Sequence, residues 1–219
     1  MDKNDKLVMV VERDFLFAGS TFHFNGFSDI SPHFLKVIHQ GHSFMRRGDM
    51  EIDPCYKQII PYCAIVHPGT KKVFAYQRSD DPADYTEGRL AGNWSWGLGG
   101  HIHPEDKVLG IDPLLVNLER ELKEETNFDG SFTPVHAGYI NDDVVPENSP
   151  AGKVHVGQVH FGVFYVIHYD GKPEDLKVKS EAKHGEWLNY AELEEIALKN
   201  PKVDSWSKIA LGVLRKICS

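Results

Sequence analysis

The sequence has few cysteines, little positive charge and no long apolar run. Its three cysteines, Cys55, Cys63 and Cys218, lack the spacing of metal ligands, which predicts reduced thiols in a cytoplasmic protein. No apolar run approaches the roughly 20 residues that span a bilayer. The N-terminal residues lack the apolar stretch and small-residue cleavage site of a signal peptide. We therefore expect a protein without membrane contact.

Basic residues are also too few for a surface that wraps nucleic acid. Lys and Arg number 24 against 32 Asp and Glu, which gives a net charge of −8 with neutral histidines. Nucleic-acid binding needs a basic face, so we expect no such partner. A small phosphate compound remains compatible, because a bound metal ion can supply local positive charge. The sequence shows no phosphate-cradling P-loop and no Ser–His–Asp arrangement.

What the sequence does contain is an ordinary globular core of mixed elements. Hydrophobic residues make up 41% of the 219, which suits one domain or one domain with an extension. Apolar runs and capped apolar periodicities predict the elements. The predicted strands cover 6–11, the two arms of a hairpin at 56–79 with its turn at Pro68-Gly69, 134–140 and 155–169. The predicted helices cover 31–40, 112–128, 191–200 and 204–217. Residues 1–50 are interpreted as an extension packed on a main domain of residues 51–219.

The helix predicted at 112–128 is amphipathic and unusually acidic. Asp112 supplies an N-cap acceptor and Pro113 suits the first helical position. Glu119 and Lys123, spaced i, i+4, predict a solvent-facing pair. The apolar stripe expected to face the core consists of Ile111, Leu114, Leu115, Leu118 and Leu122.

Glu121, Glu124 and Glu125 share a face of this helix beside that stripe. Like charges at this spacing repel, and the helix macrodipole disfavours negative charge at the C-terminal end. A divalent cation would reverse this, because Mg²⁺ prefers carboxylate oxygens. Arg120 stands one turn before Glu124 and can orient it. From these residues alone, a metal site and a merely acidic helix end both remain open.

A resemblance to a known family favours the metal site. Gly99-Gly100 followed by Arg120, Glu121, Leu122, Glu124 and Glu125 resembles the signature of the Nudix hydrolases. Two features depart from that signature. Asn127 stands where the family has glycine, and asparagine is the next-best residue for a left-handed helix end. The segment from Gly100 to the acidic Asp112 is six residues longer than usual, which puts substrate fit in question.

The resemblance implies an α/β (α+β) fold, a Nudix-type α/β/α sandwich with a mixed β-sheet. It also implies hydrolysis of a diphosphate linkage in a small-molecule nucleoside diphosphate derivative, with Mg²⁺ or Mn²⁺ as cofactor. The metals would be held by Glu121, Glu124, Glu125, the Gly99 carbonyl and a further carboxylate. Family members are often dimers, which leaves a homodimer open.

That further carboxylate is expected near the C-terminus. The stretch "SEAKHGEWLNYAEL" resembles the family segment in which a glutamate precedes a Gly-Glu-Trp strand, and the glutamate there is Glu181. The resemblance implies that Glu181, or one helix glutamate, accepts the proton of the attacking water. An exposed loop glutamate is the other interpretation of Glu181. Asp142, Asp143 and Glu147 are the alternative bases.

Arg78 and Arg89 are candidates for phosphate contacts, and Trp94 or Trp96 for stacking on a base. Surface salt bridges for the arginines and core packing for the tryptophans remain open.

The histidines offer a second metal hypothesis. His101 and His103 alternate as two ligands on a strand might, but no third soft ligand lies near them in sequence. His155 and His160 lie at opposite parity on the strand predicted at 155–169, and packing is the expected role of both.

Two other functions remain open within the same family resemblance. One is an isomerase of an isoprenoid diphosphate that uses a cysteine and a glutamate. Cys63 would be that cysteine, although a thiol inside a strand is more often structural. The other is a nucleotide-binding sensor without turnover, which would not need to keep the glutamates.

Overall fold

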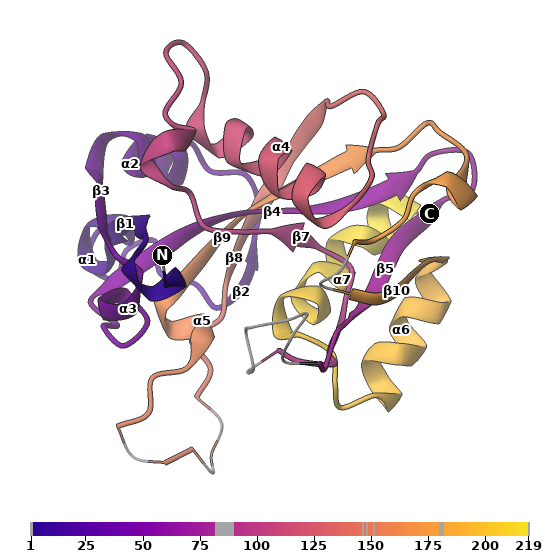
Figure 1. The fold of residues 1–219 in the computed structure, drawn as a ribbon. Coiled ribbons are helices and arrows are strands. Elements are labelled where there is room, and N and C mark those ends of the chain that lie inside the picture. The colour runs from indigo at the N-terminus through magenta and orange to yellow at the C-terminus, as the bar shows by residue number, and fades with distance from the viewer. Residues whose placement is uncertain are drawn as a thin grey trace. The chain divides into compact units, whose positions relative to one another are not determined.

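The computed structural model describes residues 2–81, 90–145, 147, 149–150, 152–179 and 182–218 (Figure 1). Its strands are β1 (Leu7–Glu12), β2 (Gly26–Ser28), β3 (His42–Arg46), β4 (Tyr56–His67), β5 (Lys72–Arg78), β6 (Trp94–Ser95), β7 (Leu98–Gly99), β8 (Pro134–Asn141), β9 (His160–His168) and β10 (Ala182–Leu188). Its α-helices are α1 (Arg13–Leu16), α2 (Pro32–Gly41), α3 (Arg47–Met50), α4 (Pro113–Glu125), α5 (Val156–Val159), α6 (Tyr190–Lys199) and α7 (Ser205–Cys218). Short 3₁₀ turns are η1 (Lys3–Asp5), η2 (Pro104–Asp106) and η3 (Pro173–Asp175).

The described strands form a ten-stranded sheet, and the predicted α/β class is confirmed. The main path of the sheet runs β10-β5-β4-β9-β8-β2. Off this path, β1 pairs with β3 and β4, β6 with β5, and β7 with β4. The chain divides into two compact units, and β4, α4, β8 and β9 contribute residues to both.

The first unit consists of residues 1–61, 100–117 and 138–164. Its strand β1 pairs antiparallel with β3 and with the start of β4, where Val11 faces Lys57. Phe34 of α2 packs on Tyr139 of β8 and Phe161 of β9, with ring centroids 4.8 and 5.2 Å apart. Residues of the predicted extension 1–50 therefore share a core with later strands. The boundary at residue 50 remains a prediction.

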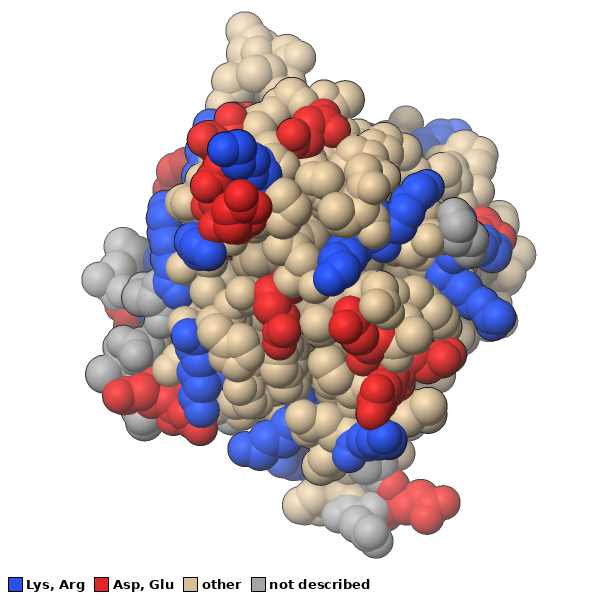
Figure 2. All heavy atoms as spheres, turned by 90° about the vertical axis from the view of Figure 1, so that its right-hand side faces the viewer, with Lys and Arg blue, Asp and Glu red and all other residues tan. Residues whose placement is uncertain are grey.

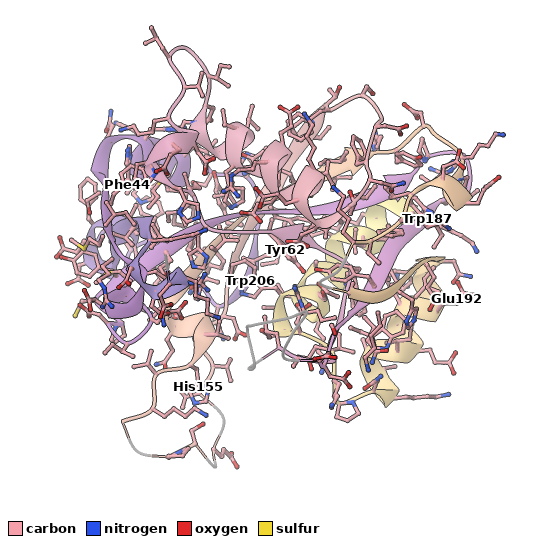
Figure 3. All side chains as sticks on the ribbon, in the orientation of Figure 1. Phe44, Tyr62, His155, Trp187, Glu192 and Trp206 are labelled. Atoms are coloured by element: carbon pink, nitrogen blue, oxygen red, sulfur yellow. The ribbon has the colours of Figure 1, made fainter. Side chains whose placement is uncertain are left out.

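The second unit consists of residues 62–99, 118–137 and 165–219. The predicted hairpin is confirmed as β4 and β5, and β10 pairs antiparallel with β5. Figure 1 shows α4 on one side of β4 and α7 on the other. Tyr62 of β4 meets Trp206 of α7 edge to face, with ring centroids 5.3 Å apart (Figure 3). This contact covers one face of the strands with the C-terminal helix.

Most predicted elements lie where the sequence indicated them, with one clear difference. The strand predicted at 155–169 begins only at His160, because Val156–Val159 form the short helix α5. His155 precedes that helix as its N-cap residue, so it does not lie on the strand. Among the described residues, no helix is both long and apolar enough to cross a membrane.

Candidate metal and catalytic site

The acidic helix α4 begins as the sequence predicts. The Leu114 amide donates to Asp112 Oδ1 at 3.0 Å, and Pro113 is the first helical residue. The stripe that faces the core is narrower than predicted. Leu114, Leu118 and Leu122 are buried, whereas Ile111 is 53% exposed and Leu115 is only half-buried. Ile111 precedes the first helical turn, so the helical period does not fix its direction.

Arg120 links two of the three predicted metal ligands. Its Nη1 donates to Glu121 Oε1 at 2.8 Å and to Glu124 Oε2 at 3.2 Å. The predicted pair of Glu119 and Lys123 also forms, with Lys123 Nζ 2.5 Å from Glu119 Oε1. On this helix, the Glu119 carboxylate is therefore paired with Lys123, whereas Glu121 and Glu124 share the guanidinium of Arg120. A shared guanidinium orients both carboxylates and offsets part of their mutual repulsion.

Glu125 lies in the last turn of α4, near buried groups of the strands. Burial raises the pKa of the Cys63 thiol far above its ordinary value, and the charge of Glu125 raises it further. Burial likewise raises the pKa of Tyr76, with Glu125 again adding to the effect. Cys63 pairs with Leu98 across β4 and β7, so Glu125 acts on the strand pair that carries Gly99.

The end of α4 differs from the prediction. Asn127 does not take a left-handed conformation; the described non-glycine residues with positive φ are Ala18 and Lys71. Asn127 instead fastens the helix end to a neighbouring segment. Its Nδ2 donates to Asp175 O at 2.9 Å, and its Oδ1 accepts from the Lys177 amide at 2.6 Å. These bonds to a segment about fifty residues later in the sequence replace the turn that a glycine would make.

Arg78 and Trp94 lie on neighbouring strands. The Arg78 guanidinium lies over the Tyr76 ring, 5.3 Å from its centroid, and the Arg78 amide donates to Asn93 O. Trp94 is half-buried and meets His184 edge to face at 5.2 Å. Trp96 is buried, and its Nε1 donates to Ser207 O at 2.6 Å. Trp96 is therefore a core residue, while Trp94 keeps part of its ring accessible.

The predicted residues Arg89 and Glu181 lie outside the described residues. Of the alternative bases, Glu147 is exposed and Asp142 is half-buried. Asp143 is held by other groups of the first unit.

Asp143 anchors a partly buried charge network and is poorly suited to act as a base. It accepts from Arg13 Nη2 at 2.6 Å, Asn141 Nδ2 at 2.7 Å and Lys57 Nζ at 2.9 Å. Burial alone would raise the pKa of Asp143, but the bonds to Arg13 and Lys57 and the charge of Lys57 hold it well below its usual range. A carboxylate with so low a proton affinity takes up a proton from water poorly.

The two alternating histidines, His101 and His103, contact different partners. The Nδ1 of His103 lies 2.8 Å from Leu7 O, whereas the Nε2 atoms of His101 and His160 lie 3.1 Å apart. His160 was expected only to pack, and no local pattern indicated its partner. The contact arises from the fold of the first unit.

Charges of both signs are interspersed on the face drawn in Figure 2. This mixture agrees with the overall acidic balance of 32 acidic to 24 basic residues. On the drawn face, no continuous basic stripe of the kind that tracks a nucleic-acid backbone is visible.

Comparisons with known proteins identify two close matches. Protein YmaB of Bacillus subtilis (strain 168) is 33% identical over 221 residues, covering 98% of this chain and 100% of that protein. The crystal structure of Tm1382, described as "a putative Nudix hydrolase", is 25% identical, covers 97% of this chain and 100% of that chain, and gives a TM-score of 0.73. No family model matches the chain.

A more distant structure is the bifunctional NMN adenylyltransferase/ADP ribose pyrophosphatase from Francisella tularensis, complexed with AMP and a Mn ion. It is 14% identical, covers 74% of this chain and 42% of that chain, and gives a TM-score of 0.47. The AMP and the Mn ion are ligands of that protein.

The similarity to YmaB and to Tm1382 extends over nearly the whole chain, well beyond the short glutamate motif. The α/β/α sandwich with a mixed sheet that the motif implied is the fold that this chain has. The chain has the Nudix hydrolase fold and is related to YmaB over its whole length.

Proposed function

We propose that this chain is a metal-dependent diphosphatase that cleaves a small-molecule nucleoside diphosphate derivative by attack of water. The observation that carries the proposal is the carboxylate cluster on α4, in which Arg120 bonds to both Glu121 and Glu124. Arg120 offsets only part of the repulsion in this cluster at the C-terminal end of the helix, and a divalent cation would offset more of it. The all-oxygen donor set suits Mg²⁺ or Mn²⁺.

Glu121, Glu124 and Glu125 would hold the metal, with the Gly99 carbonyl as a further ligand. When bound there, the metal would neutralise diphosphate oxygens and lower the pKa of a bound water. Arg120 would act as a positioning residue, because it contacts two of the ligands. Its two bonds fix the carboxylate directions before a metal arrives, which reduces the ordering that binding requires.

The general base in this proposal is Glu181 or one of the helix glutamates. A base must come within hydrogen-bond reach of the water it deprotonates. Asp143 is the weakest alternative, because Arg13 and Lys57 already occupy its oxygens. Asp142 and Glu147 remain alternatives to Glu181.

Arg78, Arg89 and Trp94 would contact the substrate. The Arg78 guanidinium is held over the Tyr76 ring, so it would meet a phosphate group already oriented. The half-buried ring of Trp94 would supply a stacking surface for a base.

The experiment is a substrate panel on the full-length chain. It would contain dNTPs, nucleoside diphosphates, nucleotide sugars and dinucleoside polyphosphates, each assayed for phosphate or nucleoside monophosphate release with Mg²⁺ and with Mn²⁺. We expect metal-dependent release that Glu124→Gln abolishes and Glu119→Gln preserves. Glu119 is the matched control, because it lies on the same helix but pairs with Lys123. Equal activity in the two variants would contradict the proposal.

The same panel separates the alternative functions. An isomerase acting through Cys63 is disfavoured, because the thiol is buried and burial raises its pKa far from the reactive range. A sensor without turnover would bind a nucleotide in the panel and release no product. A cytoplasmic location remains part of the proposal, and a homodimeric state remains open.

A further inference from the structure

A second cluster of metal-ligand side chains lies in the first unit. Glu51 follows helix α3, His101 follows β7, and His160 begins β9. One ligand atom from each lies within 4.8 Å of those from the other two. Glu51 and His101 are half-buried and His160 is 6% exposed. None of these three residues belongs to the carboxylate cluster on α4.

The two imidazoles are spaced as ligands of one ion would be. Their Nε2 atoms lie 3.1 Å apart, and the rings are inclined at 68°. Two nitrogens on a tetrahedral Zn²⁺, each at about 2.0–2.1 Å, lie about 3.4 Å from each other. The observed separation is therefore close to that of two ligands on one ion. One carboxylate oxygen of Glu51 lies within 4.8 Å of the ligand nitrogens of both histidines.

The nitrogen that His160 presents is set by its other nitrogen. Nδ1 of His160 lies 2.6 Å from Val156 O, and a carbonyl can only accept, so Nδ1 carries the hydrogen. In a neutral imidazole, Nε2 is then the lone-pair nitrogen, which is the form that ligates a metal. The bond to Val156 thus both orients the ring and selects its tautomer.

The Glu51 carboxylate and the His101 backbone are also held by neighbouring groups. Glu51 Oε1 accepts from Arg47 Nε at 3.1 Å, and the His101 carbonyl accepts from Asn117 Nδ2 at 2.7 Å. The bond to Glu51 is of the kind that holds a first ligand in place in known metal sites, and the bond to His101 fixes its backbone.

The backbone around the cluster is fixed by buried groups. Lys57, which is fully buried, donates to His160 O at 3.2 Å and to Gly157 O at 2.8 Å. The Met9 amide donates to Ile102 O at 2.9 Å, next to His101. The backbone segments that carry His101 and His160 are therefore held by hydrogen bonds that do not need a metal.

We propose that Glu51, His101 and His160 form a binding site for a divalent transition-metal ion of the Zn²⁺ type. Two imidazole nitrogens and one carboxylate oxygen suit Zn²⁺ or Fe²⁺ and do not suit Mg²⁺, which demands oxygen ligands. Three protein ligands leave a coordination position for water or a small ligand. The site is independent of the proposed diphosphatase activity.

Titration of the metal-free full-length protein with Zn²⁺, followed by calorimetry, tests this. With excess Mg²⁺ present to occupy the α4 cluster, we expect one Zn²⁺ to bind in the wild type and in Glu124→Gln, which alters only the α4 cluster. His101→Gln, His160→Gln and Glu51→Gln each remove a ligand. Their Kd should rise by more than about 100-fold, the upper range for residues that only orient a ligand. His103→Gln is the matched control, because His103 lies on the same segment but bonds to Leu7 O.

A measurement on the wild type guards against variants that misfold. X-ray absorption at the zinc edge should show two imidazole nitrogens bound to the metal. Failure of the wild type to bind Zn²⁺, an all-oxygen coordination shell, or an unchanged Kd in folded His101→Gln would each overturn the proposal. Binding of Mg²⁺ in competition with Zn²⁺ at this site would overturn it as well.

Discussion

Replacing Asp143 by asparagine should strongly destabilise the fold, because it leaves a buried cation without its counter-charge. Lys57 is fully buried, and its Nζ contacts Asp143 Oδ1 at 2.9 Å, Gly157 O at 2.8 Å and His160 O at 3.2 Å. Burial lowers the pKa of Lys57 to about 8, and the charge of Asp143 opposes that effect. With three acceptors around it, Lys57 is charged at neutral pH.

The magnitude follows from the cost of breaking a buried ion pair. Removal of one partner typically costs about 3–5 kcal/mol. In Asp143→Asn the two carbonyl bonds of Lys57 remain and the new amide oxygen can still accept, so we expect about 3 kcal/mol. For a chain of this size, each kcal/mol lowers Tm by about 2–4 °C. The expected decrease in Tm is therefore about 6–12 °C.

Thermal and urea unfolding of the variant measure this effect. Asp142→Asn is the matched control, because the Asp142 carboxylate accepts only a long bond of 3.4 Å from the Val144 amide among the contacts resolved for it. We expect the control to change stability by about 0.5 kcal/mol or less. The double variant Lys57→Met, Asp143→Asn removes both charges and should be more stable than Asp143→Asn. A Tm for Asp143→Asn equal to that of the control would refute the reasoning.

Three further predictions concern the α4 cluster, the general base and pH. Mg²⁺ at about 100 times its Kd should stabilise the protein by about 2.7 kcal/mol; differential scanning fluorimetry should show this shift lost in Glu124→Gln and kept in Glu119→Gln. Glu181→Gln should lower kcat by about 10²–10⁴-fold with little change in KM, while Glu147→Gln stays within a few-fold; the reverse pattern would place the base in the loop at 141–153. Because the pKa of Asp143 is lowered in the folded state, its contribution to stability is complete above about pH 4 and is lost as pH falls below that value. The stability of Asp143→Asn should not decrease in this way below about pH 4. If its stability fell with pH as steeply as that of the wild type, the prediction would be wrong.

Local features of this protein could be predicted because they depend on a single helical or strand period. The spacing of Glu121, Glu124 and Glu125 puts them on one face of any helix that covers 113–125. The bond from Arg120 to Glu124 follows from the same period. The hairpin of β4 and β5 was likewise predictable, since two apolar runs flank a Pro-Gly turn.

Features that depend on neighbouring segments could not be predicted in this way. Asn127 was expected to form a left-handed turn, yet it bonds to Asp175 and Lys177, about fifty positions away in sequence. The apolar stripe lost Ile111 for a related reason, because that residue precedes the helix and no helical period governs it. A sequence pattern predicts the local conformation of a segment, but it does not predict the contacts that the segment makes with distant parts of the chain.

The sequence by itself determined the resemblance to the Nudix hydrolases and the carboxylate helix of this protein, because both are encoded within short, regular stretches. Only the tertiary structure decided that His101 meets His160 and Glu51. It also decided that Lys57 and Asp143 lie together, at a separation of 86 positions in sequence. Such meetings depend on strand pairing and on the packing of distant segments. No local period can specify them.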